Sequence, residues 1–128
     1  MSSSESALAH TMKVKIDYGV FVLYAVLIAY VSLRPADVTV PGQWDKVGHF
    51  VIYAVFSVLG ARLSKAPGRY LLICIGIVAY GGLMEFGQSF MPDRMMSAYD
   101  FLANAIGVAV GAIFARVISR RERYYEPV

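Results

Sequence analysis

The sequence predicts an all-α fold, an integral membrane bundle of four transmembrane helices. Three observations lead to this prediction. Of the 128 residues, 58% are apolar and only 16% are charged, whereas a soluble domain carries about 25% charged residues. The mean hydropathy is +0.56, although a globular protein of this size needs a polar shell to face water. The charged residues also leave four long stretches without any charge, so the excess apolar side chains are expected to face lipid.

The four uncharged stretches approach the length of a membrane span. A helix needs about 20 mostly apolar residues to cross about 30 Å of hydrocarbon. The stretches run over 18–33, 47–61, 70–84 and 101–115, each between charged residues. We therefore expect helices at about 17–34, 46–63, 69–91 and 98–118, within a single membrane domain over 1–128.

The first helix has a competing interpretation as a cleaved signal peptide, because Lys13 and Lys15 precede its apolar run. The segment from Val31 to Pro35 offers no convincing small-x-small cleavage site. We therefore expect this helix to stay as a membrane anchor. The serine-rich residues 1–9 are expected to form an unstructured cytoplasmic tail.

The other three helices each carry polar residues close to the same membrane boundary. Ionisable and amide groups inside spans are costly, and they usually face the bundle interior or a water-filled cavity. Residues three or four apart share a helix face. The pairs with this spacing are Asp45 with His49, Glu85 with Gln88, and Asp100 with Asn104. On the fourth helix the stripe continues through Gly107 and Gly111, a spacing that lets helix backbones approach closely.

The lysine and arginine residues predict the orientation of the bundle, because cytoplasmic loops carry an excess of them. With four spans, most of the 12 cations fall on the side of both termini: Lys13, Lys15, Arg62, Lys65, Arg69, Arg116, Arg120, Arg121 and Arg123. The opposite side has Arg34, Lys46 and Arg94. Both termini are therefore expected in the cytoplasm and the polar pairs on the other side. This role of the cations explains the net charge of +3 without nucleic acid as a partner.

The sequence contains few other motifs that indicate a structural or chemical role. Ser97 lies three residues before Asp100 and is expected to cap the start of the fourth helix. No nucleophile elbow, glycine-rich phosphate loop, zinc-binding H-E-x-x-H or C-x-x-C motif is present. No cofactor or metal is therefore assigned, and the sequence leaves open whether the protein is an enzyme.

The polar residues of the last three helices resemble a motif of the VanZ-like family of bacterial membrane proteins. The matching residues are Asp45-Lys46-x-x-His49-Phe50-x-x-Tyr53, then Glu85-x-x-Gln88, then Arg94-x-x-Ser97-x-x-Asp100-x-x-x-Asn104-x-x-Gly107. The resemblance implies a multi-pass protein of the bacterial cytoplasmic membrane. The founding member of the family is associated with resistance to the glycopeptide antibiotic teicoplanin. The resemblance implies no defined molecular activity.

The first functional hypothesis is an outward-facing pocket that binds or modifies an anionic lipid or a lipid-linked envelope precursor. A phosphate headgroup would meet Lys46 and Arg94 at the boundary. His49 and Glu85 lie deeper and could exchange protons, with Asp45 or Asp100 orienting His49. The candidate catalytic residues are thus His49, Glu85, Asp100 and Asp45, and the candidate ligand-binding residues are Lys46, Arg94, Gln88 and Asn104.

Alternatives remain open for the same residues. The first alternative is a metal site, because imidazole nitrogen and carboxylate oxygen are ligands that hold zinc or manganese. The residues that would supply them are His49, Glu85, Asp45 and Asp100, a set with a single histidine. The polar residues could instead only fix helix packing, in a protein that acts as a membrane interaction partner. A transporter or proton relay would need more polar groups in the inner half than the sequence offers a monomer. A homo-oligomer could still provide a path for transport.

Overall fold

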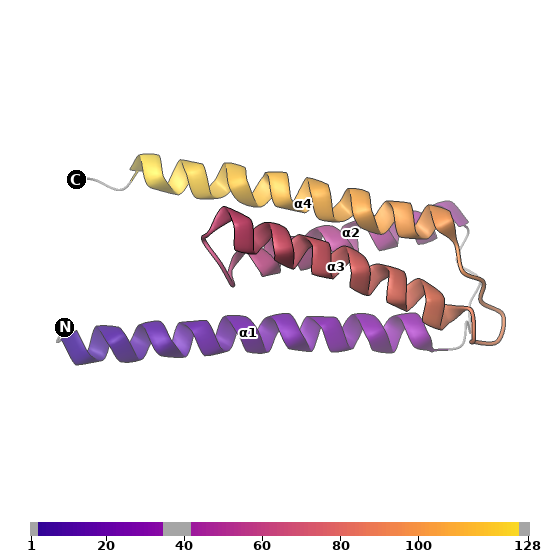
Figure 1. The fold of residues 1–128 in the computed structure, drawn as a ribbon, viewed down its shortest axis with the longest axis horizontal. Coiled ribbons are helices and arrows are strands. Elements are labelled where there is room, and N and C mark those ends of the chain that lie inside the picture. Colours follow the sequence, from indigo (N-terminus) through magenta and orange to yellow (C-terminus); the bar gives the residue numbers. More distant parts are fainter. Residues whose placement is uncertain (1–2, 35–41, 126–128) are drawn as a thin grey trace.

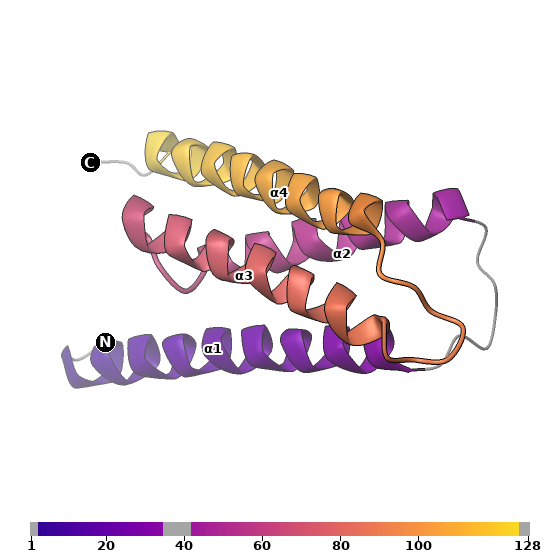
Figure 2. The same cartoon turned by 45° about the vertical axis from the view of Figure 1, so that its right-hand side comes forward.

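The computed structural model describes residues 3–34 and 42–125, which form four helices. They are α1 (Ser3–Leu33), α2 (Gly42–Ala61), α3 (Pro67–Gln88) and α4 (Ala98–Tyr125). Figures 1 and 2 show the four helices running roughly along one axis, with the start of α1 and the end of α4 at the same end of the bundle. The α2–α3 turn lies at that end too, and the α3–α4 loop lies at the other. The predicted all-α class is confirmed.

The helix boundaries differ from the predicted ones mainly in α1 and α4. α1 begins at Ser3 rather than near residue 17, so the expectation of an unstructured tail over 1–9 is wrong for the described residues. Alanine, glutamate, methionine and lysine in this segment all favour helix, so the apolar helix extends through them. α4 likewise continues past 118 to Tyr125, while α3 ends at Gln88 instead of 91, shortly before Pro92.

Three of the helices are long and apolar enough to cross a membrane, judged by length and composition. They are α1, α3 and residues 98–121 of α4. α2 falls outside this group although it has 20 residues. Its first turns contain Asp45, Lys46 and His49, which shorten its apolar part. The helix that departs most from a simple span is therefore the one that carries several of the candidate site residues.

α2 packs most extensively against α4, and two glycines allow this contact. A Cβ on Gly107 would overlap the carbonyl oxygen of Phe50, and a Cβ on Gly111 would overlap that of Ala54. The two helix backbones are therefore in direct contact along the predicted glycine stripe. Small residues at helix interfaces permit such an approach, which increases van der Waals contact between helices.

α1 packs against α2 and α3, around the buried ring of Phe56. The rings of Phe21 and Phe56 have centroids 4.7 Å apart. The Tyr24 hydroxyl donates a hydrogen bond to the Ile52 carbonyl across the interface. At the end that carries the termini, Arg62 Nη2 lies 2.6 Å from Asp17 Oδ1, and the Asp17 side chain is only 7% exposed. This ion pair fastens α1 to the end of α2.

We expect Gly111→Ala to lower the thermal unfolding temperature, because the added methyl group would overlap the Ala54 carbonyl and push α4 away from α2. The loss in unfolding free energy should be about 1–3 kcal/mol, as for other overpacked interiors. Gly76→Ala is the matched control, since a Cβ there meets nothing within 4 Å. Circular dichroism of the purified proteins in detergent measures both. Equal unfolding temperatures for Gly111→Ala and the parent protein would contradict the close backbone contact.

Candidate functional site

Six polar residues from three helices gather at the end of the bundle opposite the termini. We call them the outer cluster: Asp45, Lys46 and His49 of α2, Glu85 of α3, and Asp100 and Asn104 of α4. All six were predicted site residues. Their sequence separation is large, and α2, α3 and α4 bring them to one place. Among the described residues, α1 contributes none of the hydrogen bonds or ion pairs of this cluster.

His49 is the centre of the cluster. Its Nδ1 lies 3.0 Å from Asn104 Oδ1 and 3.5 Å from Glu85 Oε1, and the side chain is 14% exposed. Its Nε2 lies 4.0 Å from Asp45 Oδ1, one helical turn earlier. Both neighbours of Nδ1 are oxygen atoms, which favours the tautomer in which Nδ1 carries the proton and donates to Asn104 Oδ1. In a neutral ring, Nε2 then has the free lone pair.

Glu85 is almost completely buried, with 1% of its surface exposed. The backbone N–H of Ser97, just before α4, lies 3.4 Å from Glu85 Oε2 and donates to it. The Ser97 hydroxyl accepts a hydrogen bond from the Asp100 N–H at 3.2 Å, which confirms the predicted helix cap. The contact of Ser97 with Glu85 was not predicted, because it depends on how the α3–α4 loop folds back over α3.

Lys46 and Asp100 form the rim of the outer cluster. Lys46 Nζ lies 3.9 Å from Asp100 Oδ1, and their side chains are 46% and 11% exposed. Asp45 is also exposed. The interior of the cluster is therefore reached past charged side chains at its rim, while His49, Glu85 and Asn104 lie beneath them.

Two of the predicted ligand-binding residues do not join the outer cluster. Gln88 is buried, with 4% of its surface exposed, but among the described residues its side chain forms no hydrogen bond with the cluster. Arg94 is half-buried, and its Nε is buried without a hydrogen-bond partner among the described residues. Their roles stay predictions.

Several buried polar atoms around this end of the bundle lack a hydrogen-bond partner among the described residues. They are Tyr53 Oη, Glu85 Oε1, Arg94 Nε, Asp100 Oδ1 and Asn104 Nδ2. A buried polar atom without a partner costs about 1–3 kcal/mol. Such a concentration is unfavourable for packing alone, and a polar ligand could satisfy several of these atoms.

The outer cluster also contains a ligand set for a metal ion. Asp45, His49 and Asp100 each offer one ligand atom, and these atoms lie within 4.8 Å of one another. An imidazole with two carboxylates suits zinc or manganese, and Asp100 Oδ1, which has no hydrogen-bond partner among the described residues, could serve as a metal ligand. The Lys46 ammonium, 3.9 Å from that same oxygen, would compete with a cation.

The polar groups of the opposite half bind one another. Tyr70 Oη donates to the Ser57 carbonyl at 3.0 Å and lies 2.9 Å from Ser57 Oγ. Ser57 Oγ also lies 3.7 Å from the Cys74 sulfur. These contacts tie α2 to α3 and account for the buried hydroxyl groups by packing.

We expect the nitrogen chemical shifts of the neutral His49 ring to show a protonated Nδ1 and an unprotonated Nε2. The reason is that Nδ1 faces the oxygen atoms of Asn104 and Glu85. His10 is the other histidine of the chain, so His10→Gln assigns the signals. Asn104→Ala should weaken the preference for this tautomer. A ring protonated on Nε2 would contradict the hydrogen bond to Asn104.

Comparison of the chain with models of known protein families, with curated proteins and with solved structures finds no match.

Proposed function

We propose that this is a VanZ-like protein of the bacterial cytoplasmic membrane, with four spans and both termini in the cytoplasm. In this proposal the outer cluster faces outward and binds or modifies an anionic lipid or a lipid-linked cell-envelope precursor. A contribution to glycopeptide resistance, including teicoplanin, would follow if that precursor is the target of the antibiotic. The motif from Asp45 to Gly107 and the excess of cations at the termini support the assignment.

One observation carries the functional part of the proposal. His49, Glu85 and Asn104 come from three helices and meet within 3.5 Å beneath a charged rim. Ionisable groups inside membrane bundles usually mark a ligand or proton pathway. Glu85 Oε1 and Asp100 Oδ1 have no hydrogen-bond partner among the described residues, which supports the same use.

The cluster suggests a division of roles. Lys46 is half exposed at the rim, where a lipid phosphate would lie, and it supplies positive charge there. Glu85 and His49, 3.5 Å apart, could pass a proton between them. In this arrangement Asn104 and the Ser97 N–H hold the two groups in place, since each bonds one of them directly.

A second candidate function is lipid binding that depends on a metal ion, and the negative charges of the outer cluster favour it. The rim of the cluster has two carboxylates, on Asp45 and Asp100, and their negative charges would repel an anionic headgroup. A divalent cation held by Asp45, His49 and Asp100 would offset that repulsion. It would also give a phosphate group a direct partner.

A structural role is the alternative. Glu85 and Asn104 are 1% and 0% exposed, and they connect α2, α3 and α4 through His49. Hydrogen bonds of this kind between membrane helices contribute on average about 0.6 kcal/mol each. In this case substitutions would reduce stability and leave no separate binding function to lose.

We expect His49→Ala and Glu85→Gln to weaken binding of undecaprenyl phosphate, an anionic lipid that carries envelope precursors, by about tenfold or more. The reason is that His49→Ala removes the imidazole at the centre of the cluster, and Glu85→Gln replaces the ionisable carboxyl group beside it with a neutral amide. Native mass spectrometry of the detergent-solubilised protein measures the bound lipid. His10→Ala and Glu5→Gln, both on the exposed start of α1, are the matched controls and should bind like the parent protein.

The same preparations separate the alternatives. Unchanged lipid binding by folded His49→Ala and Glu85→Gln proteins would contradict the proposed function. Reduced unfolding temperatures with unchanged binding per folded molecule would favour the structural role. A stoichiometric divalent metal in the parent protein that is lost in Asp100→Asn would favour the metal-dependent version.

A further inference from the structure

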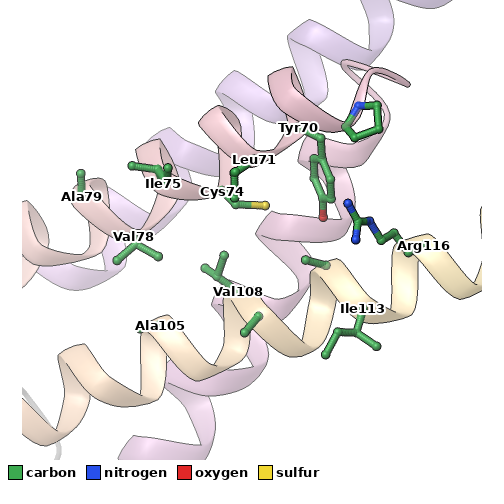
Figure 3. A pocket seen from close by; sticks show the side chains of 13 residues that line it. Tyr70, Leu71, Cys74, Ile75, Val78, Ala79, Ala105, Val108, Ile113 and Arg116 are labelled. Atoms are coloured by element: carbon green, nitrogen blue, oxygen red, sulfur yellow. The ribbon is translucent and has the colours of Figure 1, made fainter.

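An apolar groove lies between α3 and α4, on the half of the bundle that carries the termini. Its volume is about 560 Å³. Figure 3 shows it lined by Tyr70, Cys74 and Val78 of α3 and by Ala105, Val108 and Arg116 of α4. No residue of the outer cluster lines it. The groove is therefore separate from the site described above, and an inference about it does not depend on the proposed function.

Small side chains on α4 leave room for the groove. Ala105, Ala109 and Ala112 line it, and their spacing of four and three residues places them on one helix face. From Ala105 to Arg116 the groove covers about 16 Å along the helix. This length is close to half of the roughly 30 Å hydrocarbon core, which is the depth of one leaflet. The groove thus has the polarity and the length of a lipid acyl chain.

Charge is confined to one end of the groove. The Arg116 guanidinium lies beside the Tyr70 phenol, at the end nearest the termini (Figure 3). The Tyr70 hydroxyl is hydrogen-bonded to Ser57. Within the described part of the chain, no carboxylate forms an ion pair with Arg116. Among the described residues, the positive charge of Arg116 therefore has no carboxylate partner at the place where the headgroup of a lipid in the groove would lie.

We propose that this groove binds an anionic phospholipid of the leaflet on the side of the termini. One acyl chain fills the space along Ala105, Ala109 and Ala112, and the phosphate group pairs with Arg116. An arginine fork matches phosphate oxygens in a bidentate way. A zwitterionic phospholipid would fill the apolar part equally well, but its own cation would weaken the attraction to Arg116. The site therefore selects lipids by net charge.

The test compares phosphatidylglycerol with phosphatidylcholine of the same acyl chains, added to the purified protein in detergent. Native mass spectrometry counts the lipids retained. We expect the parent protein to retain phosphatidylglycerol preferentially. Arg116→Gln should reduce that retention by about fivefold, the factor expected for one cation near a membrane surface. Arg120→Gln, one turn further along α4 and outside the groove, is the matched control and should retain the preference.

Further variants distinguish binding in the groove from a general attraction between charges. Ala109→Phe fills the groove and should abolish the preference, whereas Val110→Phe, on an exposed face outside it, should not. Arg116→Lys keeps the charge and should keep most of the binding. Equal retention of the two lipids by the parent protein would overturn the proposal. So would Ala109→Cys, in a Cys74→Ser background, forming disulfide-linked dimers in membranes, because a second copy would then cover the groove.

Discussion

The contact between the backbones of α2 and α4 is the constraint on which the candidate site depends. Gly107 and Gly111 meet the carbonyl groups of Phe50 and Ala54, where any side chain would overlap the backbone. His49 immediately precedes Phe50, and Asn104 lies one turn before Gly107. The glycine contact therefore fixes the separation of these two side chains at hydrogen-bonding distance. Glu85 of α3 then completes the arrangement from the third side.

This constraint places polar groups where burial is costly. Glu85 and Asn104 have almost no exposed surface, and Glu85 Oε1 and Asn104 Nδ2 lack hydrogen-bond partners among the described residues. A bundle selected for stability alone would gain by replacing such groups with apolar ones of similar size. Their concentration at one end, together with the self-satisfied pair of Ser57 and Tyr70 in the other half, favours a binding role for the outer end.

Much of the fold and the membership of the outer cluster could be predicted from the sequence, because helix length and helical spacing are local properties. The stripe from Asp100 through Gly111 is an example, since one periodicity predicts both the polar pair and the close packing. Contacts between helices could not be predicted in this way. The rotation and shift of one helix against another decide that Ser97 reaches Glu85 and that Arg62 pairs with Asp17. They also decide that, within the described part of the chain, the Gln88 side chain forms no hydrogen bond with the outer cluster.

In the proposed orientation, α2 crosses the membrane despite its charged start and presents the outer cluster on the side opposite the termini. Cysteine labelling at its two ends tests this most directly, with Trp44→Cys and Lys65→Cys in a Cys74→Ser background. Both positions are exposed. In intact bacterial cells a membrane-impermeant maleimide should label the cysteine at 44, and the cysteine at 65 only after permeabilisation. Labelling of both cysteines from the same side, or only of the one at 65 in intact cells, would contradict the proposed orientation of α2.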